Sequence, residues 1–190
     1  LEAARNIDVV LFDKTGTLTK GEQGVVAIVS NDDARTLSLA AALEKESEHP
    51  IAKAIFQYAR SQNVPEIHTT DFSALSGRGV RAKAGDKMVY VGGPRLLEEL
   101  KLKLDSELQK AAEEASTDGK TVVYVVEDKT VLGAIMLADV IREESKEAVA
   151  RLHDMGKRVA MLTGDSKGVA AWVAKELGIK EYFAEVLPEN

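Results

Sequence analysis

Residues 7–19 read IDVVLFDKTGTLT, and this stretch decides the fold. Its first part, residues 7–12, is a short and mostly apolar run that is typical of a buried strand in a parallel sheet. The run ends abruptly at Asp13, where polar residues and a glycine predict a loop at the carboxyl end of the strand. Residues 158–162 (RVAML) repeat the arrangement and lead into the tripeptide TGD at 163–165. Two apolar strands that each end in a polar loop indicate an α/β fold.

Helices are predicted beside these strands. Residues 142–155 have a helical pattern that Gly156 ends, and a second helix is expected at 166–177. The order strand, helix, strand, helix is typical of a doubly wound parallel sheet.

The middle of the chain has a different pattern, in which short strands alternate with turns and helices. We expect strands at 23–30, 80–84, 88–91, 121–127 and 130–137, and helices at 33–45, 51–62 and 94–116. This order predicts an antiparallel sheet flanked by helices, an α+β domain inserted into the α/β unit after its first strand. The boundaries fall near 21 and near 128, so that 1–20 with 129–190 form a discontinuous α/β domain and 21–128 form the inserted domain.

Composition excludes several classes of protein. The chain has 190 residues, of which 45% are hydrophobic, a normal share for a protein with a buried core. Its formal net charge of -6 argues against a nucleic-acid-binding surface, because phosphate backbones attract clustered Lys and Arg. The lack of Cys excludes disulfides and thiolate metal sites, and the three scattered His do not suggest structural zinc. No apolar run approaches the roughly 20 residues that cross a bilayer, and a start without Met leads us to expect a piece of a longer protein.

The two polar loops contain residues suited to phosphate chemistry. Ligands of a doubly wound sheet bind where strands end at their carboxyl edge, so the loops at Asp13 and before the 166–177 helix should meet there. Asp13 can act as a carboxylate nucleophile, because an acyl phosphate divides phosphoryl transfer into two steps, and Mg²⁺ would reduce its repulsion from the phosphate. Thr163 and the Gly164 amide can donate hydrogen bonds to phosphate oxygens, and Gly16 allows a close approach of the backbone. For an Asp-Lys pair alone, the simpler interpretation is a turn residue after a strand.

The seven residues at 13–19 reproduce the phosphorylation signature of P-type ATPases, and the chain therefore resembles the catalytic part of these pumps. The resemblance implies that Asp13 accepts the terminal phosphate of ATP. It also implies a haloacid dehalogenase-like phosphorylation domain with an inserted nucleotide-binding domain. The catalytic residues that it implies are Asp13, Lys14, Thr15, Thr163, Gly164 and Asp165, with Mg²⁺ held by Asp13 and the Thr15 carbonyl.

Residues 44–50 (EKESEHP) resemble the nucleotide-binding segment of the heavy-metal, or CPx-type, branch, in which a Glu and a His-Pro pair accompany the adenine. Residues 77–79 (GRG), followed by 92–93 (GG), resemble the glycine-rich nucleotide loop of that branch. A carboxylate can accept a hydrogen bond from the adenine amino group, a histidine can stack or donate, and glycines let the base lie against backbone. Gly93 stands where the family usually has Asn. The ATP contacts implied by the resemblance are Glu44, His49, Gly77, Gly79 and Gly92.

Asp139 and Arg142 match an Asp-x-x-Arg pair of the same family. The resemblance implies that this pair contacts the nucleotide and belongs to the hinge where the inserted domain returns to the α/β unit. On spacing alone, Asp139 is better explained as the N-cap of the following helix. Both interpretations stay open, since a cap residue can also contact a ligand.

The resemblance covers nearly the whole chain, and residues 21–25 and 182–188 are most similar to copper-exporting members. It implies an ATP-dependent copper translocase of the cell membrane, with this part on the cytoplasmic side. Its partners would be ATP, the pump's own membrane and actuator domains, and a copper ion bound outside this chain. The family continues past its Leu-Pro segment with further phosphate and Mg²⁺ ligands. We therefore expect the α/β unit that ends at Asn190 to be C-terminally incomplete and the chain alone to be weakly active.

Two alternatives remain open. A soluble phosphatase of the haloacid dehalogenase superfamily would share the α/β unit, but such enzymes commonly place a second Asp two residues after the nucleophile as general acid and base. Thr15 stands at that position and cannot do this, so a phosphoryl group on Asp13 should be long-lived. A non-catalytic nucleotide-binding module would instead bind ATP with an affinity that does not depend on Asp13.

Overall fold

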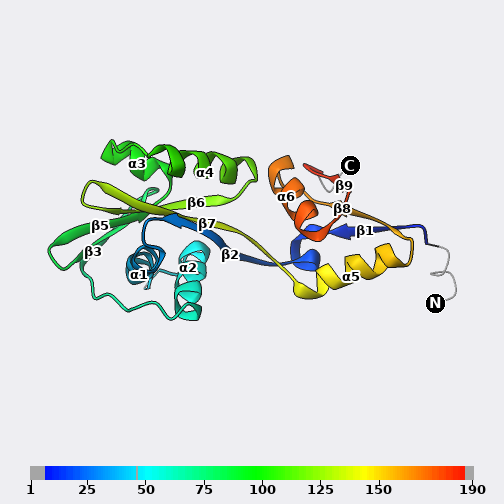
Figure 1. Ribbon diagram of the computed structural model, residues 1–190, viewed down its shortest axis with the longest axis horizontal. Coiled ribbons are helices and arrows are strands. Elements are labelled where there is room, and N and C mark those ends of the chain that lie inside the picture. Colours follow the sequence, from blue (N-terminus) through cyan, green and yellow to red (C-terminus); the bar gives the residue numbers. More distant parts are fainter. Residues whose placement is uncertain (1–6, 46, 187–190) are drawn as a thin grey trace. The chain divides into compact units, whose positions relative to one another are not determined.

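The computed structural model describes residues 7–45 and 47–186, and the chain divides into two compact units (Figure 1). Unit 1 comprises Leu1–Glu22, Thr117–Gly119 and Asp139–Asn190, and unit 2 comprises Gln23–Ser116 and Lys120–Ala138. The second main boundary thus follows Ala138, rather than the predicted position near 128, because a long strand continues the sheet of unit 2 to that point. The last part of the copper-exporter resemblance, residues 187–188, and the chain end at Asn190 lie outside the described residues.

Unit 1 contains a three-stranded parallel sheet in the order β1-β8-β9. Its elements are β1 (Val9–Asp13), α5 (Glu143–Asp154), β8 (Arg158–Leu162), α6 (Lys167–Leu177) and β9 (Glu181–Phe183). The predicted α/β arrangement with a parallel sheet is confirmed. Strand β9, which the sequence did not predict, is only three residues long.

One face of this sheet packs against helices. Val159 and Met161 of β8 lie in one buried cluster with Val149 of α5 and Val173 of α6. Burying such side chains contributes about 2 kcal/mol each. Side chains alternate along a strand, so Leu11, which pairs with Ala160, belongs to the opposite face and is 54% exposed.

Unit 2 is built on a six-stranded sheet in the order β2-β7-β6-β5-β4-β3. The strands are β2 (Thr19–Ser30), β3 (Thr70–Leu75), β4 (Gly79–Ala84), β5 (Lys87–Gly92), β6 (Thr121–Glu127) and β7 (Thr130–Ile141). Neighbours from β3 to β7 pair in antiparallel fashion, which confirms the predicted antiparallel sheet. Strand β3 was not predicted, because its alternation is interrupted by a register shift between Thr70 and Ser73.

Helices cover both faces of this sheet (Figure 1). They are α1 (Asp33–Glu44), α2 (Pro50–Ser61), α3 (Pro94–Leu100) and α4 (Ser106–Thr117). Strand β6 contributes to both cores: Val123 and Val125 pack with α1 and α2, whereas Tyr124 packs with α3 and α4. The local sequence explains the helix starts, since Asp32 accepts a hydrogen bond from the Arg35 amide, and Pro50 lies in the first turn of α2.

The single helix predicted at 94–116 is wrong, because two helices occupy this range. Lys101 adopts a left-handed conformation (φ 53°) that ends α3. The Leu108 amide then donates to the Asp105 carboxylate at 2.8 Å, which begins α4. No Gly or Pro marks the break, so the helical pattern seemed continuous.

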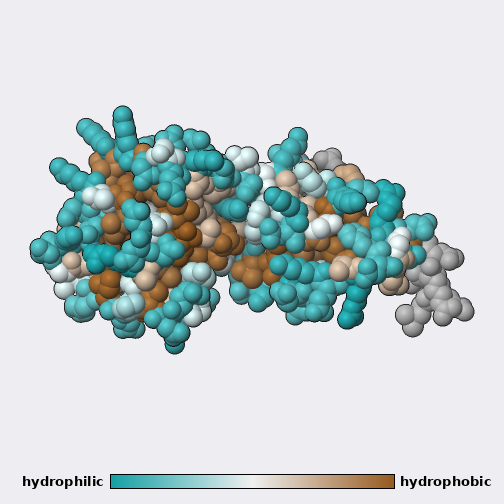
Figure 2. All heavy atoms as spheres, viewed as in Figure 1, coloured by the Kyte–Doolittle hydropathy of each residue, from teal (hydrophilic) through white to brown (hydrophobic). Residues whose placement is uncertain are grey.

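The surface is largely hydrophilic. Figure 2 shows hydrophobic side chains of unit 2 between its helices, bordered by hydrophilic ones. Within residues 7–45 and 47–186, no helix is both long enough and apolar enough to cross a bilayer.

Candidate active site and nucleotide pocket

Two polar loops of unit 1 meet at one edge of the parallel sheet. Asp13, the last residue of β1, pairs in parallel register with Leu162, the last residue of β8. Parallel strands end at the same edge, so the exposed Asp13 lies beside Thr163 and the loop that leads into α6. The structure therefore brings together two segments about 150 positions apart in sequence.

The turn Lys14–Leu18 follows Asp13 and leads into β2. Thr15 (φ -78°, ψ 124°) and Gly16 (φ 77°, ψ -14°) have the central dihedral angles of a type II turn, whose second position requires a positive φ. A Cβ on Gly16 would meet no atom within 4 Å, so the turn conformation, rather than space, favours glycine here.

Lys14 is buried, with only 2% of the residue exposed, and links two acidic side chains. Its ammonium group donates to the Asp139 carboxylate and forms an ion pair of 2.6 Å with the Asp165 carboxylate. Burial by itself would lower the pKa of Lys14, but the hydrogen bonds and charges of Asp139 and Asp165 outweigh it and raise the pKa above its ordinary value. Lys14 is therefore charged at neutral pH and joins the strand that carries Asp13 to the end of β7 and to the loop after β8.

The TGD loop is held by its own hydrogen bonds. The Thr163 hydroxyl donates to Asp165 at 2.8 Å and accepts from the Asp165 amide at 3.1 Å. Burial would raise the pKa of Asp165, but the Lys14 ammonium and the Thr163 hydroxyl lower it below its usual range. Gly164 between them is exposed at the sheet edge.

The N-cap interpretation of Asp139 is wrong. Asp139 lies within β7, and the N-cap of α5 is Arg142, which makes no side-chain capping bond. Arg142 instead stabilises the turn after Asp13: its backbone amide donates to the Leu18 carbonyl, and its guanidinium donates to the carbonyls of Thr19 and Gly16 at 3.2 and 3.3 Å. Whether either residue also contacts a nucleotide stays a prediction.

A pocket of about 740 Å³ lies in unit 2, within the volume range of small-molecule sites. The residues that the sequence resemblance assigned to ATP all line it; they are Glu44, His49, Gly77, Gly79 and Gly92. Helices α1 and α2 contribute one wall, and the turn before β4 and the end of β5 contribute another.

Glu44 and His49 enter this pocket from helix termini. Glu44 is the last residue of α1, and burial raises its pKa to about 7, although a hydrogen bond with Ser47 opposes the shift. His49 caps α2, since its Nδ1 accepts from the Ile51 amide at 3.3 Å. In a neutral ring with Nδ1 as acceptor, Nε2 carries the proton and can donate to a ligand.

The close approach of two backbone segments also requires glycine at two positions of the pocket. A Cβ on Gly79 (φ 135°) would lie 2.0 Å from the Val91 carbonyl oxygen, and one on Gly92 would lie 2.0 Å from the Arg78 carbonyl oxygen. Strands β4 and β5 therefore approach more closely here than any side chain permits. Gly77 (φ 68°) has open space around it.

Sequence reasoning missed four polar residues that line the same pocket: Ser47, Ser76, Arg78 and Arg95. Arg78 forms an ion pair with Glu99 at 2.9 Å. Both arginines adjoin glycine-rich segments, GRG at 77–79 and GGPR at 92–95, and this neighbourhood is the signal that could have found them. Arginine suits polyphosphate binding, because its planar guanidinium can form paired hydrogen bonds with phosphate oxygens.

Comparison with known proteins places this geometry in a family. The sequence model described as "Hydrolase: haloacid dehalogenase-like hydrolase" matches residues 7–189. The chain belongs to this family. A parallel-sheet unit with a long insertion after its first strand is thus a variation on the haloacid dehalogenase-like fold.

Within the family, the chain is similar to heavy-metal pumps over its full length. It is 43% identical to copper-exporting P-type ATPase B of Archaeoglobus fulgidus over 191 residues, which is 100% of this chain and 27% of the relative. It is 37% identical to a copper-exporting P-type ATPase of Staphylococcus aureus, of which it covers 23%. The chain therefore spans about a quarter of the length of these relatives.

Solved structures of heavy-metal P-type ATPases are also similar to the chain. A zinc-transporting PIB-type ATPase in its E2.Pi state matches with a TM-score of 0.83 and 35% identity, over 96% of this chain and 30% of that one. The catalytic domain of the CPx-ATPase CopB-B, from a study of nucleotide binding, matches with a TM-score of 0.62 and 31% identity, over 99% of this chain and 66% of that one. The predicted resemblance to the catalytic part of heavy-metal P-type ATPases is confirmed.

Proposed function

We propose that this chain is the ATP-binding and self-phosphorylating part of a heavy-metal pump, in which Asp13 accepts the γ-phosphoryl group of ATP. A carboxylate oxygen of Asp13 forms a bond to the γ-phosphorus while the bond to the β,γ-bridging oxygen breaks, and ADP leaves. Unit 1 acts as the phosphorylation domain and unit 2 as the nucleotide-binding domain.

The observation that supports this proposal most directly is the register of β1 and β8. It sets a solvent-accessible carboxylate, Asp13, next to a loop with an exposed glycine, Gly164. The Gly164 amide suits the oxygens of a transferring phosphoryl group, whereas the buried Thr163 hydroxyl donates to Asp165 and holds the loop in shape. The positive charge of Lys14 lies behind them and fixes Asp165 and Asp139, which keeps both carboxylates from repelling the incoming phosphate.

The pocket in unit 2 supports ATP as the phosphoryl donor. Its neutral, backbone-lined wall at Gly77, Gly79 and Gly92 fits a flat base, and Glu44 can accept a hydrogen bond from an exocyclic amino group. Arg78 and Arg95 on the same pocket suit the phosphates.

Mg²⁺ fits the oxygen donors at the sheet edge. Among the described residues no group of three or more His, Cys, Asp or Glu could hold a metal ion. Mg²⁺ usually takes only one or two protein carboxylates together with substrate phosphates and water, so this is compatible. Asp13 and the Thr15 carbonyl would hold the ion, which would neutralise charge between carboxylate and phosphate.

The finer assignments rest on the relatives. The sequence relatives named above are copper exporters and a matched structure is a zinc transporter, and we propose copper because the copper exporters reach the higher identity. In the complete pump, membrane and actuator domains would carry the ion and complete the cycle, with this part on the cytoplasmic side of the cell membrane. The chain alone should bind ATP but turn over slowly.

The test is transfer of radioactive phosphate from γ-labelled ATP in membranes that contain the complete pump. Acid-stable label should appear in the unaltered protein and be absent from the Asp13→Asn variant. Asp8→Asn is the matched control, because Asp8 is exposed just before the opposite end of the same strand and should leave labelling unchanged.

Labelling that survives Asp13→Asn would refute the proposed nucleophile. Rapid release of phosphate from small phosphate esters by the chain would instead favour the phosphatase alternative. ATP binding without any labelled enzyme in the complete pump would favour the non-catalytic module.

A further inference from the structure

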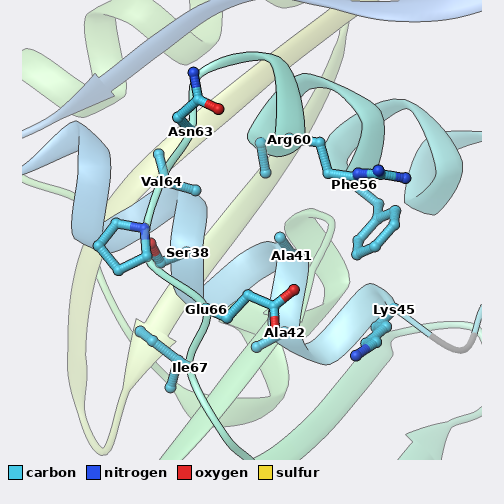
Figure 3. Close-up of a pocket in the computed structure, with 12 residues that line it drawn as sticks. Ser38, Ala41, Ala42, Lys45, Phe56, Arg60, Asn63, Val64, Glu66 and Ile67 are labelled. Atoms are coloured by element: carbon cyan, nitrogen blue, oxygen red, sulfur yellow. The ribbon is translucent and has the colours of Figure 1, made fainter.

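A second cavity of unit 2 lies between α1 and α2, away from the nucleotide pocket (Figure 3). Its volume is about 380 Å³. Each helix contributes residues spaced i, i+3, i+4 and i+7, which share one helical face: 38, 41, 42 and 45 from α1 and its C-cap, and 56, 59, 60 and 63 from α2 and the residues after it. The segment 64–67, which belongs to no helix or strand, closes the third side. Two helix faces and this closing segment therefore line a cavity that is partly open to solvent.

Ser38 is the first sign that this cavity takes a ligand. The residue is 3% exposed and lines the cavity, and among the described residues its Oγ is the one buried side-chain oxygen or nitrogen without a hydrogen-bond partner. Buried hydroxyl groups are normally paired, because leaving one unpaired is costly. A bound molecule with a hydrogen-bonding group would satisfy it.

The walls around Ser38 are apolar and small. Ala41 and Ala42 come from α1, Phe56 from α2, and Val64 and Ile67 from the closing segment. Alanines keep the space open where larger side chains would fill it. The volume is at the lower end of small-molecule sites, which suits a body of about one ring.

Charged side chains surround this apolar space. Lys45 lies at one end of the cavity, and the Glu66 side chain extends from the closing segment toward α1 (Figure 3). Arg60 of α2 also lines the cavity. None of these three takes part in an ion pair within the part of the chain that the structure describes. Two cations and one anion leave a net positive rim, which favours a ligand with a single negative charge.

We propose that this cavity binds a small amphiphilic monocarboxylate, whose apolar body lies on Phe56, Val64 and Ile67. One carboxylate oxygen or a neighbouring polar group pairs with the Ser38 hydroxyl. Lys45 and Arg60 attract the negative charge, and Glu66 disfavours a second one.

The cavity is distinct from the nucleotide pocket, because the two have no lining residue in common. They nevertheless share both helices: Glu44 of α1 faces one and Lys45, the next residue, faces the other. The proposal does not depend on the function assigned to Asp13.

The test uses 3-phenylpropionate as the probe and the 190-residue chain labelled with ¹⁵N. We expect saturable amide shift changes at residues 38–45 and 56–67, with a dissociation constant on the order of 1 mM for so small a ligand. The neutral amide and the cationic amine of the same skeleton should bind several-fold more weakly. Excess ATP should not displace the probe.

Variants make the test specific. Ala42→Leu should fill the cavity and abolish binding, while Ala34→Leu, at an exposed alanine of the same helix, should not. Lys45→Ala should weaken the binding of 3-phenylpropionate several-fold and Glu66→Gln should strengthen it. Lys53→Ala, which removes an exposed lysine outside the cavity, is the charge control.

Ser38→Ala separates a ligand role from a structural one. If the hydroxyl serves a ligand, the variant binds the probe several-fold less tightly and is no less stable than the unaltered protein. A less stable variant with unchanged binding would overturn the proposal. So would tighter binding of the amine, displacement by ATP at its own binding concentration, or shift changes that survive Ala42→Leu.

Discussion

Each unit withdraws an ionisable side chain from water at a candidate site, fully for Lys14 and partly for Glu44, and the two side chains are paired differently. Lys14 in unit 1 is paired with Asp139 and Asp165, which raise its pKa despite burial. Glu44 in unit 2 has only Ser47 to oppose its desolvation, which raises its pKa to about 7. At the sheet edge that carries Asp13, the buried charge of Lys14 is thus already paired in the absence of a ligand. In the nucleotide pocket, the Glu44 carboxyl can gain or lose a proton when a ligand binds.

The largest effect is expected from removing the buried cation of unit 1. Lys14→Met leaves Asp139 and Asp165 without their shared cation, and we expect it to destabilise unit 1 by about 3 kcal/mol, somewhat less if water reaches the partly exposed Asp165. Urea unfolding combined with hydrogen exchange of β1 and β8 measures this.

Lys146→Met is the matched control, because Lys146 is exposed on α5 and should change the stability of unit 1 little. Equal stabilities of the Lys14 and Lys146 variants would mean that the buried ion pairs do not hold unit 1 together.

A second substitution tests the walls of the nucleotide pocket. Gly79→Ala would place a Cβ 2.0 Å from the Val91 carbonyl oxygen at a positive φ, and we expect a loss of about 2 kcal/mol in unit 2 with weakened ATP binding. Gly77→Ala has open space and only its positive φ to oppose it, so about 1 kcal/mol is expected. Thermal unfolding and calorimetric ATP titration compare the two, and a Gly77 variant as unstable as the Gly79 one would contradict the role of the β4–β5 approach.

The raised pKa of Glu44 predicts that the stability of unit 2 and its affinity for ATP depend on pH. The folded-state pKa of Glu44, about 7, lies above its ordinary value of 4.5, so the native state binds the proton more tightly than the unfolded chain. Its contribution to stability is therefore most favourable below pH 4.5 and is lost as the pH rises toward 7. An adenine amino group needs the deprotonated carboxylate, so ATP affinity should rise roughly tenfold between about pH 6 and pH 8.

Calorimetric titration of ATP across this range, with Glu44→Gln and Glu48→Gln as variants, isolates the effect. The Glu44 variant should lose most of the pH dependence, while the exposed Glu48 should not matter. The role of Glu44 would be excluded if its variant and the unaltered protein had parallel pH profiles.

The smallest effect concerns the turn after Asp13. Arg142→Ala removes guanidinium hydrogen bonds to the carbonyls of Thr19 and Gly16, which are worth about 1 kcal/mol together at these lengths. Faster hydrogen exchange of the amides of Lys14–Leu18 should reveal it, with global stability nearly unchanged. Arg151→Ala, at an exposed position of α5, serves for comparison. Equal exchange rates in the Arg142 and Arg151 variants would mean that the Arg142 guanidinium does not stabilise the turn.

Much of the fold could be predicted because local pattern and fold agree. The apolar run at 7–12 and the abrupt change at Asp13 correspond to β1 and its end, and the strand at 158–162 corresponds to β8. The pocket residues also followed from sequence, because motif resemblance identified Glu44, His49 and the glycines, which then lined one cavity. Their roles toward ATP stay a prediction.

The features that could not be predicted depend on distant contacts or on very short elements. Asp139 looks like an N-cap locally, yet its partner Lys14 is 125 positions away. Strand β9 has only three residues, too few to show alternation. The break between α3 and α4 depends on the left-handed conformation of Lys101, and no residue type in that stretch indicates this conformation.

The separation of Lys14 from Asp139 also bears on the order in which the protein takes shape during translation. Residues 23–138 leave the ribosome as one nearly uninterrupted piece and can fold on arrival. Strand β1 is made before them but finds its neighbour β8 only after residue 162, a delay on the order of 10 s at ordinary elongation rates. Within this stretch, the segment that carries Asp13 is thus synthesised before residues 23–138 but completes its sheet only after them, so its apolar side chains stay unpaired with β8 in the meantime.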